Sequence, residues 1–294
     1  MIKTYLNLSR LRIILGLLWI LDGFIELQPK LFSNFLASLV LRSSDVNQPS
    51  IIHSQVLFVI NILVRHPAIF NFFFVLIQLG VGFLIINPKT VRLGLKVSIL
   101  WGLFIWYFGE GLGNLLTHSA LLISGAPGAA LLYVIIAIGL YPYKKTSSKY
   151  LLNWFSISVV GYYLIGIVLI LANSMNLNMA ISSMVHANAI TSTGLISKLQ
   201  SHFANFIAGR SHNIAFLIIF IYLLLAGSVL MNSRIRSIGI YLGIIIALFF
   251  WIIGQNFGGV LVGTATDLNS GPLVILMLLG LRASPTLRLK LSEL

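Results

Sequence analysis

The segment WYFGEGLGNLLTHSALLISGAPG, residues 106–128, interrupts a chain that otherwise consists mostly of apolar runs. It contains the carboxylate of Glu110, His118 and several glycines, and it leads directly into another apolar run. A second segment of similar character, WIIGQNFGGVLVGTATDLNSGP, occupies residues 251–272. Irregular backbone at membrane depth is tolerated only where it is buried in protein or lines a wet cavity. We therefore expect these two segments to turn the chain and to form any functional site.

The composition indicates an integral membrane protein with the lipid bilayer as its main partner. Of the 294 residues, 58% are hydrophobic and only 9% are charged, whereas soluble domains carry about 25% charged residues. The net charge of +13 comes from short basic clusters between apolar runs, which is typical of membrane topology and not of a nucleic-acid-binding face. The absence of cysteine excludes disulfides and thiol chemistry.

Eight apolar runs are candidates for membrane-spanning helices, and a span needs about 20 residues. The fourth and eighth runs are shorter, so they either extend into the glycine-rich segments or are completed by re-entrant loops. The sequence thus predicts an all-α, polytopic membrane helix bundle with eight transmembrane helices, at residues 11–27, 69–86, 93–109, 129–141, 154–172, 213–231, 238–254 and 273–281.

The distribution of basic residues predicts the orientation. Most of the 19 Lys and Arg residues fall near the two chain ends, in residues 89–96 and 144–149, and at Arg234 and Arg236. The positive-inside rule places these segments in the cytoplasm. We therefore expect a multi-pass protein of the cell (plasma) membrane with both termini cytoplasmic and both glycine-rich segments facing outward.

An internal duplication relates residues 145 positions apart. Trp106, Gly109, Gly113 and Pro127 match Trp251, Gly254, Gly258 and Pro272 at this offset. The pattern predicts two four-helix membrane repeats, residues 1–146 and 147–294. Because each repeat contains an even number of spans, both have the same orientation, which favours a pseudo-two-fold axis along the membrane normal.

Two acids near the end of the first apolar run are candidate site residues. Asp22 and Glu26 are four residues apart and share one helix face, with Trp19 one turn earlier. Trp106 and Glu110 repeat this spacing at the end of the third run. Ionisable groups in or at the edge of a membrane are costly and are functional candidates by default. The alternative is that the acids reach the lipid headgroups and the tryptophans form an interfacial belt.

The duplication restricts these candidates to one half. Glu110 aligns with the neutral Gln255, and the first-run acids align with apolar residues, which leaves Asp267 as the acid of the second segment. We therefore expect a single site in the first repeat. The predicted catalytic residues are Asp22 and Glu110, and the predicted ligand-binding residues are Trp19, Glu26, Gln28, Trp106, Gly109, Gly113, His118, Pro127, Gln255 and Asp267.

Two alternatives apply to parts of this set. The glycines are equally typical of close helix packing in membranes. No pair of histidines has the spacing of a recognised metal motif, so no metal site is expected.

Residues 195–207, and their counterpart 51–64, have a helical apolar period with a polar face, which suits either an interfacial helix or an ordinary surface helix.

The motifs LRIILGLLWILDGFIELQP, FGEGLG and GAPGA resemble those of the DoxX/DoxD-like superfamily of small four-helix membrane proteins, in particular a double-length, tandem form. The matching residues include Trp19, Asp22, Gln28, Glu110 and Pro127, while the carboxylate of Glu26 departs from the family pattern. The resemblance implies a link to thiosulfate:quinone oxidoreduction.

These observations lead to three functional hypotheses. The first is a quinone-linked redox subunit with a redox partner subunit, in which Asp22 and Glu110 accept protons and Trp19 and Trp106 pack a flat ligand; quinone is its candidate cofactor. The second is a permease or channel for a small solute or ion. The third is a non-catalytic membrane anchor or assembly subunit. The inner halves of the apolar runs contain almost no polar residue apart from Lys96, which mildly disfavours transport.

Overall fold

A computed structural model describes residues 8–41, 45–141, 148–173, 177–208 and 210–283. The described chain forms helices and no strands. Five segments are long and apolar enough to cross a membrane: Pro67–Ile86, Val91–Gly109, Trp154–Ala172, Asn213–Leu230 and Ser233–Gly254. The protein is therefore an all-helical, multi-pass membrane bundle.

The first half of the chain supplies α1 to α5 and five short 3-10 or π-helical turns. In chain order these are α1 (Leu8–Ile25), η1 (Pro29–Phe32), η2 (Leu36–Leu41), α2 (Ser50–Leu63), α3 (Pro67–Ile86), α4 (Val91–Phe104), η3 (Ile105–Gly109), η4 (Gly111–Asn114), η5 (Leu122–Ser124) and α5 (Ala129–Leu140).

The second half has a similar order. It comprises α6 (Ser148–Ala172), α7 (Leu177–Thr191), α8 (Gly194–Ile207), α9 (Ser211–Leu230), α10 (Ser233–Phe249), η6 (Phe250–Gly254), η7 (Asn256–Val262) and α11 (Ser270–Ala283). The amphipathic segments predicted at 51–64 and 195–207 are confirmed as the helices α2 and α8, whereas α7 was not predicted. The predicted boundary between 146 and 147 lies outside the described residues.

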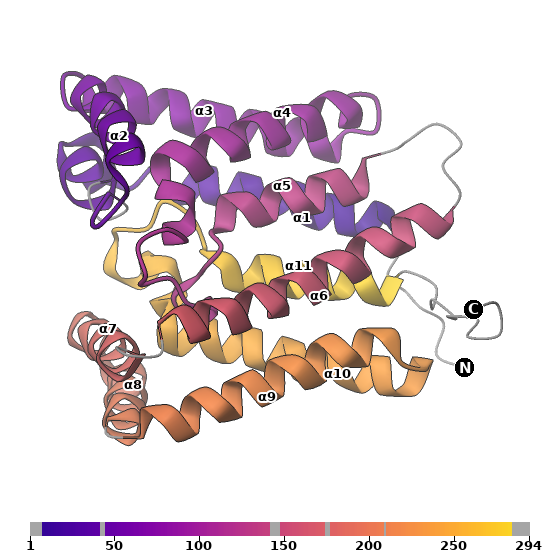
Figure 1. Ribbon diagram of the computed structural model, residues 1–294. Coiled ribbons are helices and arrows are strands. Elements are labelled where there is room, and N and C mark those ends of the chain that lie inside the picture. Colours follow the sequence, from indigo (N-terminus) through magenta and orange to yellow (C-terminus); the bar gives the residue numbers. More distant parts are fainter. Residues whose placement is uncertain (1–7, 42–44, 142–147, 174–176, 209, 284–294) are drawn as a thin grey trace.

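The long helices run side by side between two distinct ends of the bundle (Figure 1). Helices α2, α7 and α8 lie at one end, which we call the α2 end, together with both glycine-rich segments. The described start of α1 and end of α11 lie at the other, the terminal end. Helices α3 and α4 flank one side and α9 and α10 the other, with α5 and α11 between them.

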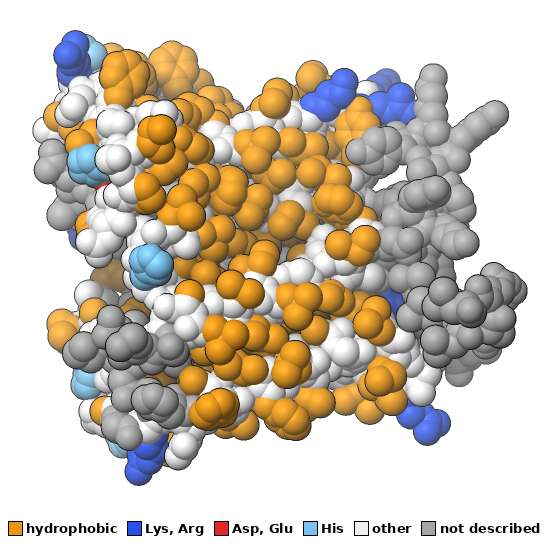
Figure 2. All heavy atoms as spheres, viewed as in Figure 1, with side chains coloured by type: hydrophobic (Ala, Val, Ile, Leu, Met, Phe, Trp, Pro, Cys, Tyr) orange, Lys and Arg blue, Asp and Glu red, His pale blue; other side chains and the backbone are white. Residues whose placement is uncertain are grey.

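The surface has the pattern expected for a protein in a bilayer. Figure 2 shows hydrophobic side chains over the middle of one face, with Lys and Arg side chains towards both ends and His side chains towards the α2 end. Large apolar side chains on the outer helices are exposed, among them Leu100, Phe216 and Ile245. In a bilayer such side chains face lipid, so their exposure is compatible with a stable fold.

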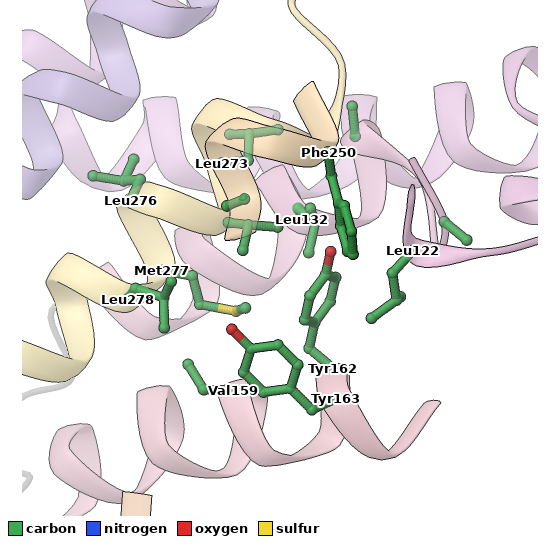
Figure 3. Packing of buried hydrophobic residues seen from close by; sticks show 14 of the residues in the cluster. Leu122, Leu132, Val159, Tyr162, Tyr163, Phe250, Leu273, Leu276, Met277 and Leu278 are labelled. Carbon is green, nitrogen blue, oxygen red and sulfur yellow. The ribbon is translucent and has the colours of Figure 1, made fainter. Parts of the chain in front are cut away.

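Two packing features hold the bundle together. Gly16 of α1 and Gly82 of α3 face each other so closely that a Cβ on either would meet the backbone of the other helix, and small residues permit such crossings in membranes. In the centre, the buried rings of Tyr162 and Tyr163 point from α6 into a cluster that includes Leu132 of α5 and residues of α11 (Figure 3).

Both glycine-rich segments follow a helix that ends in a π-helical turn. These turns, η3 at Ile105–Gly109 and η6 at Phe250–Gly254, lie 145 residues apart. Each is followed by residues with left-handed backbone, including Leu112 (φ 57°) and Phe257 (φ 55°). The segments thereby fold back on the helices that precede them, so α5 and α11 begin beside those helix ends.

Candidate functional site: an acid–aromatic cavity

The α1 residues selected from the sequence share one buried face. Trp19, Asp22 and Glu26 are each only 2% exposed. The Trp19 indole Nε1 donates a hydrogen bond to Ser98 Oγ of α4 at 2.9 Å, and its ring stacks on Tyr133 of α5 with 4.1 Å between centroids. The predicted helix face is thus confirmed, and it points into the bundle and not to lipid headgroups.

Asp22 is held by both halves of the chain. The Tyr133 hydroxyl donates to Asp22 Oδ2 at 2.5 Å, and the backbone N–H of Leu268 donates to Oδ1 at 3.2 Å. Each carboxylate oxygen therefore has a donor. The second contact shows that the segment between η7 and α11 helps to build a site that the sequence assigns to the first half.

Glu110 lies where the first glycine-rich segment leaves η3. Its Oε1 accepts a hydrogen bond from the Ala130 backbone N–H at 3.0 Å, in the first turn of α5, where the helix dipole favours a negative charge. A Cβ on Gly128 (φ 109°) would collide with this carboxylate, which explains the glycine. Burial, with a further contribution from Asp267, raises the pKa of Glu110 to about 8.

Trp106 and Gly113 close the same loop. The Trp106 indole donates to the Pro127 carbonyl oxygen at 2.8 Å, and a Cβ on Gly113 (φ 62°) would overlap that carbonyl. In the second half, Trp251 donates to the Leu268 carbonyl at 2.7 Å. Pro127 matches Pro272 in sequence, but the acceptor in the second contact is Leu268, because donor and acceptor are 21 residues apart in the first segment and 17 in the second.

Asp267 brings a fourth carboxylate to the same place. Its side chain accepts from the Asn269 backbone N–H at 2.5 Å and from the Thr266 hydroxyl at 3.2 Å. Burial raises the pKa of Asp267 despite these bonds. Asp22, Glu26, Glu110 and Asp267 all line one cavity at the α2 end of the bundle.

This cavity, which we call the acid–aromatic cavity, has a volume of about 100 Å³. Six aromatic residues form much of its wall, and none of its lining residues is Lys, Arg or His. Besides the four acids it is lined by Trp19, Phe74, Trp101, Phe104, Phe108 and Tyr133, and by Leu36, Leu41, Val59, Leu63, Gln78, Ile105, Gly109, Ala129, Ala130 and Thr266.

Several polar atoms of this lining have no hydrogen-bond partner among the described residues. They are Glu26 Oε2, Glu110 Oε2, Gln78 Oε1 and the indole Nε1 of Trp101. Leaving a buried polar group unpaired costs about 1–3 kcal/mol. Three of these four atoms are acceptors, so the cavity offers more acceptors than donors to a bound molecule.

The cavity is closed towards the terminal end and covered by α2. Below the Trp19–Ser98 bond, Leu15, Leu95 and Leu132 are fully buried. On the other side, Val59 and Leu63 of α2 belong to the lining. Helix α2 packs through a small apolar cluster of its own rather than through the main core.

Two hydrogen bonds join this cover to the first glycine-rich segment and the turn before it. The Tyr107 hydroxyl donates to Gln55 Oε1 at 2.6 Å, and Gln48 Nε2 donates to the Gly111 carbonyl at 2.7 Å. The region between η2 and α2 is further joined to α2 by a contact of His53 Nδ1 with Asp45 Oδ2 at 2.9 Å.

The structure brings together only part of the predicted set. Trp19, Asp22, Glu26, Gly109, Glu110 and Asp267 line the cavity, while Trp106, Gly113 and Pro127 shape the loop behind it. The other three lie elsewhere. His118 is exposed, Gln28 is outside the lining, and Gln255 accepts from the Gly271 backbone N–H at 3.0 Å in the second half.

Sequence reasoning missed Tyr133, Gln78, Trp101 and three phenylalanines of the lining. Tyr133 and Gln78 are each the one polar side chain within an otherwise apolar helical run, AALLYVIIAIGL and FFFVLIQLGVGFLII respectively. That signal was present in the sequence. The phenylalanines gave no such signal, because aromatic residues are common on lipid-facing surfaces as well. Among the described residues no group of three or more His, Asp or Glu side chains is placed to hold a metal ion.

No family model matches the chain, and comparisons with curated proteins and with solved structures find no match. The resemblance to DoxX/DoxD-like proteins therefore has no support beyond the motifs themselves.

Proposed function

We propose that this protein binds a small amphiphilic molecule in the acid–aromatic cavity, from the outer side of the cell membrane. The observation that carries the proposal is the set of buried acceptor oxygens on Glu26, Glu110 and Gln78 that have no partner, within a cavity walled by aromatic rings. Binding sites for small molecules combine apolar walls with a few placed polar groups. A ligand with an electropositive polar end and an apolar remainder fits both parts of this lining.

The proposed orientation follows from the basic residues. The α3–α4 and α9–α10 turns at the terminal end carry Lys89, Arg92 and Arg234, so the positive-inside rule makes this end cytoplasmic and the α2 end outward. In this arrangement α1, α5 and α11 also cross the membrane. Together with the five long apolar segments they give eight spans, and both chain ends are cytoplasmic. The paired π-helical turns support two repeats of the same orientation.

The closed floor favours binding over transport. A pathway across the membrane needs polar groups in both halves of the bundle. Beneath Trp19 and Ser98 the packing consists of fully buried leucines and isoleucines, including Leu15, Leu95 and Ile136. A permease or channel would have to open this apolar layer.

A quinol-linked redox subunit is the second candidate. The unpartnered Trp101 indole N–H and the carboxylate oxygens offer one donor and several acceptors for a flat dihydroxy ring. In that case Asp22 and Glu110 accept the two hydroxyl protons, and a redox partner subunit takes the electrons. The DoxX-like resemblance implies this function, and the cavity has the chemical groups for it.

Photoaffinity labelling tests whether the cavity is a binding site. Wild-type protein in zwitterionic lipid nanodiscs is labelled with decylamine and with decyl hydroquinone, each carrying a diazirine in its chain. We expect cross-links on α4, η3 and α2, near Phe104, Phe108 and Val59, which excess unlabelled compound suppresses. Labels distributed over lipid-facing residues such as Phe216, with no suppression by competitor, would contradict the proposal.

A further inference from the structure

We propose that the acid–aromatic cavity recognises an organic cation, a protonated or quaternary amine on an apolar chain, with Glu26 and Glu110 as the charge partners of its nitrogen. This inference rests on the proposed binding function and names the class of its ligand. Charge, hydrogen-bonding capacity and the arrangement of the aromatic rings in the cavity all point to this class of ligand.

The first argument is charge. Four carboxyl groups line a cavity that contains no Lys, Arg or His. Carboxyl groups gathered in a site of low polarity raise the cost of ionising one another. Each group can be neutralised by a proton, but a bound cation neutralises the site while leaving the carboxylates ionised. A cationic ligand would thus supply the positive charge that the cavity lining lacks.

The second argument is the way the four acids are already used. Asp22 and Asp267 both accept bonds from backbone and hydroxyl donors of the protein. Glu26 Oε2 and Glu110 Oε2 are buried without a partner. The two aspartates therefore hold the loop and α5 in place, whereas each glutamate retains one oxygen that can meet a ligand.

The Gln78 Oε1 atom adds a third free acceptor beside these two. A primary ammonium group has three N–H donors and no acceptor, which matches three acceptors. A hydroquinone would use its two hydroxyl groups and bring oxygens that need donors in return, while Trp101 Nε1 is the one unpartnered donor in the lining.

The third argument is the wall of rings. Phe74, Trp101, Phe104 and Phe108 form a continuous row, with successive centroids 5.5, 5.3 and 5.0 Å apart. The stacked Trp19 and Tyr133 form a second aromatic wall. Ring faces attract cations by about 0.5–2 kcal/mol, the larger values applying away from water. Carboxylates combined with such walls suit an amine better than a hydrated metal ion, and the described side chains form no metal site.

The position of Phe104 accounts for an apolar chain on the ligand. This side chain lines the cavity and is also 40% exposed on the outside of α4. The cavity volume of about 100 Å³ holds a small headgroup and not a long chain. The remainder of an amphiphile would pass Phe104 and lie in the surrounding lipid.

The test compares four compounds with the same decyl chain and different polar ends. Decylamine, decyltrimethylammonium, decanol and decanoate are titrated into wild-type protein in zwitterionic lipid nanodiscs, and binding is followed by calorimetry and by quenching of tryptophan fluorescence. Nanodiscs without protein correct for partitioning into lipid. We expect one or both cations to bind at least tenfold more tightly than decanol, and decanoate to bind most weakly.

Two variants separate recognition of charge from general binding. Glu26→Gln keeps the size and an acceptor oxygen but removes the charge, so it should weaken cation binding at least tenfold and leave decanol unchanged. Gln255→Glu adds a carboxyl in the second half, 145 positions after Glu110, and should leave the binding of the cations and of decanol unchanged. Both variants are first checked for an elution profile and helix content like those of wild type.

The outcomes distinguish this inference from the function on which it rests. If decanol or decyl hydroquinone binds as tightly as the cations, and Glu26→Gln changes nothing, the cation inference is wrong while the binding function stands. If no compound binds above the level of empty nanodiscs, both are wrong. If Glu26→Gln weakens cation binding alone, both are supported.

Discussion

Residues 145 positions apart in the two halves of the chain border two very different cavities. The acid–aromatic cavity is bordered by Trp101, Phe104 and Ile105 of α4 and η3. The residues 145 positions later, Ile246, Phe249 and Phe250, border a second cavity of about 190 Å³ between α8, α9 and α10. The lining of the second cavity presents only apolar surface. Residues at corresponding positions thus enclose a cavity without any acid in its lining.

The clearest instance is the pair Glu110 and Gln255. Both side chains follow a π-helical turn, and each accepts a bond at 3.0 Å from a backbone N–H at the start of the next helix, Ala130 or Gly271. An amide therefore performs the same structural task as the carboxylate. The charge and the unpartnered Oε2 of Glu110 are therefore available to a ligand. Substitutions in either half of the chain can test this difference between Glu110 and Gln255.

The largest effect is expected at Glu26, whose counterpart is Leu171. Glu26→Leu removes a buried carboxyl that has one unpartnered oxygen and one hydrogen bond with the Gln78 side chain. We expect a small change in melting temperature, because these two features oppose each other, together with a loss of cation binding of about 100-fold or more, because the removal of one partner of a buried ion pair costs about 3–5 kcal/mol. Thermal denaturation and calorimetry measure the two effects.

Leu171→Ala is the matched control for Glu26→Leu. It should leave ligand binding unchanged, since Leu171 faces outward on α6 and is 60% exposed. A Glu26→Leu variant that binds the cations as tightly as wild type would show that the Glu26 carboxyl is not their charge partner.

Tyr133 is expected to give the next largest effect. Tyr133→Phe removes the hydroxyl that donates to Asp22 Oδ2, and hydrogen bonds to charged groups contribute about 1.5–3 kcal/mol. Tyr222→Phe in the second half is the control, because Tyr222 is equally buried but lies among apolar residues and other tyrosines. Unfolding in detergent should show a loss for Tyr133→Phe that is at least twice that for Tyr222→Phe. Equal losses would mean that the bond to Asp22 adds nothing to stability.

The pH dependence of stability should differ between the halves. The pKa of Glu110 is raised from 4.5 to about 8 in the folded protein, so between these values the folded state binds more protons than the unfolded state. The contribution of Glu110 to the free energy of unfolding is therefore greatest at low pH and is lost as the pH rises towards about 8. Glu110→Gln should flatten the fall in melting temperature between about pH 5 and 8, and Gln255→Glu should add a similar fall.

Loss of the Glu110 proton, which lowers the stability of the fold, should raise the affinity for a cationic ligand. An organic cation pairs with the ionised carboxylate, so its affinity should rise as the pH increases through about 8, where Glu110 loses its proton. In Glu110→Gln this part of the rise should be absent. Affinity measured for decyltrimethylammonium, whose charge does not change with pH, isolates the protein's contribution. A pH profile that is the same in wild type and Glu110→Gln would exclude Glu110 as the titrating group.

Much of this site could be predicted from sequence, because a few of its residues are chemically conspicuous. Asp22 and Glu26 at helical spacing, and Glu110 in a glycine-rich segment, stand out against apolar surroundings. Which residues meet them depends on how helices distant in sequence pack. Asp22 and Leu268 are 246 residues apart, and no local pattern connects them. The duplication misled in one place, since the proline at 272 matches Pro127 in sequence while Leu268 has its structural position.

The smallest expected effect concerns the part that the two halves share. The indoles of Trp106 and Trp251 each donate one bond to a loop carbonyl, at 2.8 and 2.7 Å, and neither bond involves a carboxylate. Trp106→Phe and Trp251→Phe should therefore each lower stability by a similar amount, about 1 kcal/mol for the lost bond. Denaturation of the two variants in the same detergent gives the comparison. A much larger loss for Trp106→Phe would mean that the Trp106 bond also supports the acid–aromatic cavity. Equal losses would mean that the two indole bonds contribute equally to stability, and the buried acids would then be the property that separates one half from the other.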